Sequence, residues 1–115
     1  MASISEAPLR TLKIKTAVVE RISKELDSYY AELEDNKKTV EEIRRSDDHS
    51  KLKQMENVLG ETQCMIPDTM TRLTNAIDDL SALLDSNSTN ELLAGTPELD
   101  RATAAISNAS KKVES

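Results

Sequence analysis

The apolar residues of this 115-residue chain recur at alternating steps of three and four, and this spacing constrains the fold more than any other feature. The clearest stretch reads Val19, Ile22, Leu26, Tyr29, Leu33, Val40 and Ile43. Such a heptad pattern keeps one narrow stripe of a helix against a partner helix. A narrow stripe predicts an elongated helical bundle without a deep pocket. We therefore expect this protein to act by surface contact with another macromolecule.

The composition also favours an all-α fold. Tyr29 and Tyr30 are the only aromatic residues, so the core must be built mainly from aliphatic side chains, methionine and alanine. The chain has only two glycines and three prolines, and sheets or turn-rich folds need more of both.

Breaks in the heptad pattern divide the chain into three predicted helices. We place them at about residues 8–45, 50–85 and 97–113, with residues 1–7 frayed, in one domain covering residues 1–115. The polar connectors are short, so consecutive helices must return antiparallel. The expected fold is an elongated, spectrin-like (coiled-coil-like) antiparallel three-helix bundle.

Two polar residues, Lys15 and Asn36, fall on the seam of the first predicted helix. A polar residue at such a position often fixes the register of two helices at some cost in stability. In the third predicted helix, Thr96 is the expected N-cap and Pro97 the first helical residue. Its seam contains Leu99, Ala102, Ile106, Ala109 and Val113.

The second predicted helix has a disturbed pattern near its middle. Its seam reads Leu52, Met55, Leu59, Gln63, Ile66, Met70, Leu73, Ile77, Leu80 and Leu84. The step from Leu59 to Gln63 repeats a four, so the phase slips beside Gly60. An interior proline removes a backbone hydrogen bond and costs roughly 3 kcal/mol. We therefore predict a kink near Pro67, with two separate helices as the alternative.

The net charge of −6 is unevenly distributed. Residues 1–24 carry five basic side chains against two acidic ones. An acidic total argues against nucleic-acid binding, but the basic segment can meet an acidic partner. The single cysteine, the lack of an apolar run of membrane-spanning length and the absence of a signal-peptide pattern favour a cytosolic protein without a membrane anchor.

No set of residues suggests catalysis, a metal or a bound cofactor. The sole histidine, His49, lies in a polar connector beside Asp47 and Asp48, where a solvated turn is the simpler interpretation than a metal site. Cys64 has no basic neighbour to activate it, and we expect a buried or half-buried thiol. The chain is therefore not expected to be an enzyme.

Two short blocks resemble a known family. Residues 12–21, with the sequence LKIKTAVVER, are similar to the start of tubulin-binding cofactor A. A second block, Met65-Ile66-Pro67-Asp68 followed by Arg72-Leu73, resembles the second helix of that family around its proline. The similarity covers roughly residues 9–84 and fades over residues 85–115.

The resemblance implies a three-helix protein that captures β-tubulin after the cytosolic chaperonin and holds it without nucleotide, before it meets α-tubulin and other tubulin-folding cofactors. We expect the contact on the first two helices. The candidate partner-binding residues are Lys13, Ile14, Lys15, Val18, Arg21, Tyr30, Ile66, Pro67 and Asp68.

Other interpretations remain open at this point. Ile14 and Val18 could instead widen the core stripe, as happens in many globular helices. The chain could also be a structural coiled-coil subunit or adaptor of another assembly, such as a prefoldin-like subunit or a vesicle-tethering bundle. The first connector is too short for the strand pairs of prefoldin. Both a monomer and a homodimer are compatible with the seam.

Overall fold

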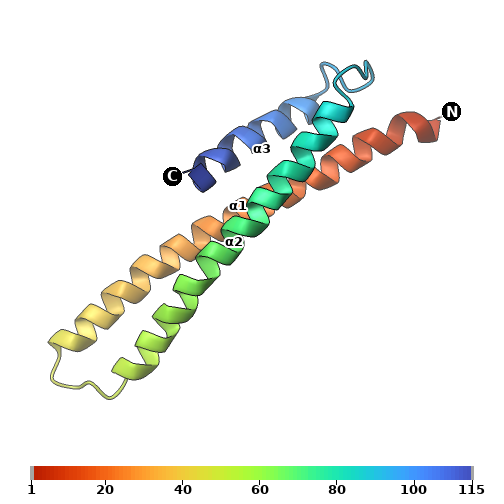
Figure 1. The fold of residues 1–115 in the computed structure, drawn as a ribbon. Coiled ribbons are helices and arrows are strands. Elements are labelled where there is room, and N and C mark those ends of the chain that lie inside the picture. Colours follow the sequence, from red (N-terminus) through yellow and green to blue (C-terminus); the bar gives the residue numbers. More distant parts are fainter. Residues whose placement is uncertain (1, 115) are drawn as a thin grey trace. The chain divides into compact units, whose positions relative to one another are not determined.

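The computed structural model describes the backbone of residues 2–114 and the side chains of residues 8–114. Over this part of the chain it contains three helices and no strand: α1 (Ala2–Arg45), α2 (Leu52–Ser86) and α3 (Pro97–Glu114) (Figure 1). The predicted all-α helical bundle is therefore confirmed. The chain divides into two compact units, which are described separately below. Unit 1 contains Met1–Ser23 and Thr71–Ser115, and unit 2 contains Lys24–Met70.

Unit 2 is a hairpin formed by the end of α1 and the start of α2, which lie side by side in Figure 1. Asn36 Nδ2 donates to Thr62 Oγ1 at 2.9 Å, and nearer the connector Arg44 Nη2 lies 3.3 Å from Glu56 Oε2. From Asn36 to Arg44 the residue number rises along α1, whereas from Thr62 to Glu56 it falls along α2. The two helices of the hairpin are thus antiparallel, as the short connector requires.

Unit 1 holds all of α3, together with the start of α1 and the end of α2. Lys13 Nζ lies 4.0 Å from Glu98 Oε1, Arg101 donates two hydrogen bonds to the Glu20 carboxylate, and Lys112 Nζ lies 3.5 Å from the carbonyl oxygen of Ser23. In these three contacts the residue number rises along α1 and along α3 together. α3 therefore runs parallel to α1, as expected when three helices alternate in direction.

The buried seam of α2 contains three residues that its prediction lacks, Thr62, Thr69 and Ala76. Gln63 is exposed, and Thr62 occupies the buried position instead. With Thr62 in place, the alternation of threes and fours continues without a phase slip beside Gly60. The buried set in α2 is Thr62, Ile66, Thr69, Leu73, Ala76, Ile77 and Leu80. The prediction failed because it placed only large apolar residues and one glutamine on the seam of α2. In the structure, buried threonines maintain the heptad spacing.

Buried threonines are tolerated here because their hydroxyl groups are hydrogen-bonded within the helix. Thr62 Oγ1 donates to the carbonyl oxygen of Val58 at 3.1 Å, and Thr69 Oγ1 donates to that of Met65 at 2.7 Å. Such bonds to the carbonyl four residues back satisfy the hydroxyl without a partner helix. The methyl group of each threonine is then left to pack in the seam.

In α1, too, a threonine occupies the buried seam position that was predicted for a longer polar residue. Lys15 was expected on the seam, but it is half-buried, while Thr16 is only 1% exposed. Thr16 Oγ1 donates to the carbonyl oxygen of Leu12 at 2.7 Å. Asn36 does lie on the seam, half-buried and bonded to Thr62. Of the two predicted polar seam residues, only Asn36 is confirmed.

The start of α1 was predicted too late. The helix begins at Ala2 and not near residue 8, so Pro8 lies inside it. Proline has a φ angle compatible with a helix, and its main local cost is one missing backbone hydrogen bond. α2 is one continuous helix that contains Pro67, which excludes the alternative of two separate helices. The bend at Pro67 stays a prediction.

Both connectors use side-chain caps. Thr96 Oγ1 accepts a hydrogen bond from the Leu99 amide at 3.2 Å, with Pro97 as the first residue of α3, as predicted. In the first connector Asp48 Oδ1 accepts from the Ser50 amide at 2.9 Å, which lowers the pKa of Asp48. This contribution to stability is complete above the pKa of the unfolded chain and is lost as pH falls through the lower folded value.

The core of α3 consists of alanines. Ala102, Ala105 and Ala109 are buried, whereas the larger Leu99, Ile106 and Val113 are half-buried. Ala105 was absent from the predicted seam. Small side chains let a helix approach its neighbours closely. The buried face of α3 therefore adds little side-chain volume to the core.

Candidate functional site

The five candidate residues on α1 in unit 1 do not share one environment. Ile14 is 58% exposed, Val18 and Lys15 are half-buried, and Arg21 is exposed. Positions 14, 18 and 21 follow an i, i+4, i+7 spacing, so they share one face of α1. Lys13 is on a different side, because it pairs with Glu98 of α3 at 4.0 Å.

Ile14, Lys15 and Val18 line a hollow of about 160 Å³ together with Ala76 and Asp79 of α2. This hollow is the feature that brings predicted site residues together. Sequence analysis missed Ala76 and Asp79. The heptad register observed in α2 would have identified both residues. It places Ala76 on the seam and the exposed Asp79 three residues later, on the neighbouring surface of the helix.

The four candidates in unit 2 are less uniform. Tyr30 is 42% exposed, and Pro67 and Asp68 are also exposed. Ile66 is only 9% exposed and belongs to the packed seam, so it is not available to a partner while the helices are packed. These residues therefore form no common pocket in unit 2.

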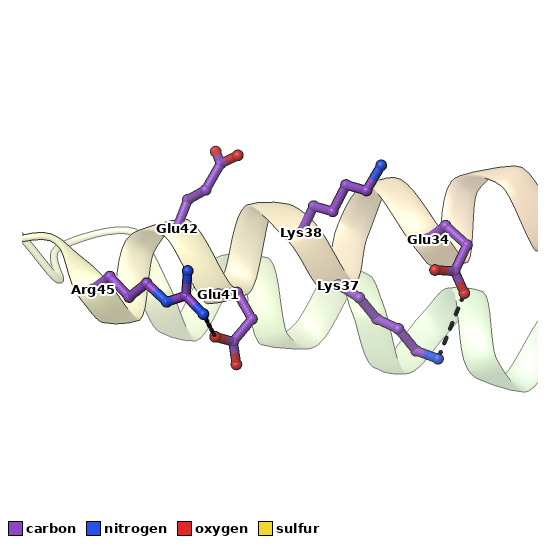
Figure 2. Close-up of a pocket in the computed structure, with 6 residues that line it drawn as sticks. All are labelled: Glu34, Lys37, Lys38, Glu41, Glu42 and Arg45. Atoms are coloured by element: carbon purple, nitrogen blue, oxygen red, sulfur yellow. Dashed lines mark ion pairs between the residues drawn. The ribbon is translucent and has the colours of Figure 1, made fainter.

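A second hollow, of about 340 Å³, lies on the polar face of α1 in unit 2 and has a different character. Figure 2 shows its lining side chains, all charged: Glu34, Lys37, Lys38, Glu41, Glu42 and Arg45. Lys37 Nζ lies 3.8 Å from Glu34 Oε1, and Arg45 Nη2 lies 3.5 Å from Glu41 Oε2. Balanced charges at helical spacing are typical of a solvated face, and exposed pairs of this kind are weak.

The cysteine prediction was wrong. Cys64 is exposed, because the register that buries Thr62 and Ile66 turns the residues between them outward. Met65 is also 37% exposed and so lies outside the core. His49 Nε2 lies 3.2 Å from the carbonyl oxygen of Arg44 in the first connector. Among the described residues, no group of three or more His, Cys, Asp or Glu side chains is placed to hold a metal ion.

Within residues 2–114, none of the helices combines the length and apolar character that crossing a membrane requires.

Comparison with known proteins identifies the family. The family model for tubulin binding cofactor A matches residues 7–106. The chain is 40% identical to the tubulin-folding cofactor A of Arabidopsis thaliana over 107 residues, which is 92% of this chain and 94% of the relative. It is 31% identical to the tubulin-specific chaperone A of Schizosaccharomyces pombe over 92% of this chain and 87% of that protein.

Solved structures agree with the sequence relatives. The crystal structure of the Arabidopsis thaliana cofactor matches with a TM-score of 0.82 at 38% identity, covering 92% of this chain and 98% of the other. The human tubulin chaperone cofactor A matches with a TM-score of 0.75 at 30% identity, covering 90% and 98%. Matching sequence and fold over nearly the full length of both chains show that this protein belongs to the tubulin binding cofactor A family of tubulin-folding chaperones.

Proposed function

We propose that this protein captures β-tubulin after its release from the cytosolic chaperonin and holds it by non-covalent surface contact. The observation that carries the proposal is membership of a family whose named members are tubulin-folding cofactors and tubulin-specific chaperones. The binding uses no nucleotide, and its place is the cytoplasm. β-tubulin is then passed on to further tubulin-folding cofactors.

The surface of α1 supports a role in protein binding. Ile14 is 58% exposed, and a large branched apolar side chain so open to water is stabilised when a partner covers it. Lys15 is its neighbour in the chain, Arg21 follows two turns later on the same face of α1, and both can meet acidic surface on the client. Charges at the rim of an interface mainly raise the rate of encounter. This segment is therefore the proposed β-tubulin contact in unit 1.

Preformed helices also suit this task. The backbone of α1 and α2 is already hydrogen-bonded along its length, so little backbone ordering is needed when a client binds. Tyr30 supplies a further exposed ring in unit 2, and aromatic side chains of this kind are common binding anchors. Both a monomer and a homodimer can present these residues.

The proposal is tested by pull-down from cytosol with the full-length chain as bait, followed by quantitative mass spectrometry. We expect β-tubulin to be enriched over α-tubulin. Recovery of a multi-subunit helical assembly in place of β-tubulin would contradict the proposal and would instead indicate a structural subunit or adaptor. Bait carrying a charge reversal in unit 2 outside the candidate contact residues, Lys53→Glu, controls for non-specific ionic capture.

A further inference from the structure

The hollow between α1 and α2 in unit 1 is lined by three apolar residues and two charged ones. Ile14 and Val18 contribute apolar side chains from α1, and Ala76 contributes a methyl group from α2. Lys15 contributes a positive charge from α1, and Asp79 contributes a negative charge from α2. A hollow of about 160 Å³ with this lining has the size and chemistry to accept one apolar side chain.

The two charges that line it are not paired with each other. Lys15 and Asp79 line the same hollow, yet no ion pair within 4.0 Å joins them in the described part of the chain. Elsewhere in unit 1 opposite charges do pair, as Lys13 does with Glu98 and Glu20 with Arg101. An apolar lining with one unpaired charge of each sign is complementary to a ligand that carries an apolar side chain and the reverse charges.

The hollow is separate from the surface that α3 covers. None of the side chains lining it belongs to α3, which contacts α1 through Lys13, Glu20 and Ser23. Arg21 lies seven residues after Ile14 on the same face of α1 and is exposed. Arg21 lies six residues after Lys15, so the two side chains point to different sides of α1. The charged residues that line the hollow itself are Lys15 of α1 and Asp79 of α2.

The seating of α3 shows what kind of ligand the α1–α2 pair accepts. α3 packs through small buried residues, Ala102, Ala105 and Ala109, and places an acidic side chain on Lys13 and a basic one on Glu20. Glu98 and Arg101 are three residues apart on one side of α3, and both pair with α1. A helix with small apolar residues and charges complementary to those of its neighbour thus fits against α1. Helix-in-groove binding uses the same pattern of anchors.

We propose that this hollow is the anchor site for an amphipathic helix of the β-tubulin client. One aliphatic or aromatic side chain of that helix enters between Ile14, Val18 and Ala76, while an acidic residue meets Lys15 and a basic residue meets Asp79. The inference rests on the proposed function and adds to it the α2 residues, the polarity of the ligand and the position of its anchor.

The first test compares two equally exposed apolar residues. Ile14 is 58% exposed and lines the hollow, whereas Leu92 is 60% exposed and lies in the second connector. Neither side chain is buried, so both Ile14→Glu and Leu92→Glu are expected to fold, which circular dichroism checks. We expect Ile14→Glu to weaken binding of purified β-tubulin roughly tenfold or more, and Leu92→Glu to leave it unchanged.

The second test asks whether Lys15 and Asp79 each interact with the client or instead interact with each other. Lys15→Glu and Asp79→Lys are measured singly and together. If each charge meets the client, both single variants weaken binding roughly three- to tenfold and the double variant is at least as weak as either. Recovery of wild-type affinity in the double variant would mean that the two residues act on each other, and would overturn the proposed polarity.

The outcomes for the anchor and for the function are distinguishable. If wild-type protein binds β-tubulin and Ile14→Glu binds as well as Leu92→Glu, the anchor site is wrong while the proposed function stands. If wild-type protein does not bind β-tubulin, the proposed function fails and the anchor site fails with it.

Discussion

The side-chain amide of Asn36 in α1 donates a 2.9 Å hydrogen bond to the hydroxyl group of Thr62 in α2. Thr62 in turn donates to the carbonyl oxygen of Val58 at 3.1 Å, so its hydroxyl is used as both acceptor and donor. This is a polar contact between the two helices within the seam of unit 2. Its geometry is satisfied only when residues 36 and 62 lie opposite each other, so it specifies the register of the hairpin.

Thr62→Val should destabilise the protein because it leaves the half-buried Asn36 amide without its acceptor. The expected loss is about 1 kcal/mol in the free energy of unfolding, measured by urea denaturation. Asn36→Leu combined with Thr62→Val should recover at least that loss, since two apolar groups then meet. If the double variant is less stable than Thr62→Val alone, the hydrogen bond is not what Thr62 contributes.

Ala102→Leu should loosen α3. Ala102 is fully buried, and the extra volume of leucine has no space where the helix packs closely. Overpacking of this kind costs roughly 1–3 kcal/mol, read from thermal or chemical unfolding. Ala104→Leu is the matched control, because Ala104 is exposed on the same helix and leucine is a good helix former. Equal effects of both substitutions would contradict the assigned face of α3.

Pro67→Ala should raise the free energy of unfolding by roughly 1–3 kcal/mol, because alanine restores a backbone donor in the interior of α2. We expect the affinity for β-tubulin to be unchanged, because we expect the proline to affect only the direction of the α2 helix axis. Gln63→Ala is the control, because Gln63 is exposed on α2, lies outside the candidate binding residues and leaves the backbone donors intact. Loss of affinity in Pro67→Ala, with stability retained or raised, would instead assign the bend to the binding face.

Reversing the basic residues Lys13, Lys15 and Arg21 to glutamate should weaken β-tubulin binding, mainly through a slower association rate. The effect should be larger at low ionic strength, where exposed charges are less screened, and surface plasmon resonance at two salt concentrations measures it. Lys13→Glu also places a like charge near Glu98, so circular dichroism must show that α3 is retained.

The control for this triple variant carries the same change in net charge elsewhere. Lys38, Lys51 and Lys53 are exposed lysines of unit 2, and their reversal should leave the association rate much less affected. Equal slowing in both triple variants would mean that only the net charge matters. Unchanged binding in the first variant would remove the basic segment from the contact.

The helices were predictable because their signals are local. The heptad spacing, the Thr96 cap with Pro97 and the polar connectors each act within a few residues, so the sequence predicts all three helices, and the ends of α2 and α3 lie within two residues of their predicted positions. The start of α1 was missed because Pro8 was given too much weight as a boundary.

The register was harder to predict because polar residues can occupy seam positions in two ways. Asn36 satisfies its side chain across the helix pair, whereas Thr16, Thr62 and Thr69 satisfy theirs within their own helix. The prediction placed Lys15 and Gln63 on the seam by their spacing, whereas their neighbours Thr16 and Thr62 are the buried residues. The internal hydrogen bond of threonine is the physical reason for the correct register.

The candidate site could be predicted only in part. Ile14 and Val18 were identified on α1, but the hollow they line needs Ala76 and Asp79 from α2, and that pairing depends on how two distant segments meet. Ile66 was proposed as a contact residue although the packed seam covers it. Which residues face each other across helices is not a local property, so one sequence without the structure cannot supply it.

The central claim is that the folded chain binds β-tubulin directly. The most direct measurement is a binding titration of purified chain against β-tubulin released from chaperonin, with α-tubulin measured in parallel and no nucleotide added. The account predicts a saturable complex with β-tubulin and at least tenfold weaker binding of α-tubulin, roughly 1.4 kcal/mol of discrimination. A helical, folded chain that binds neither tubulin, or both equally, would contradict it.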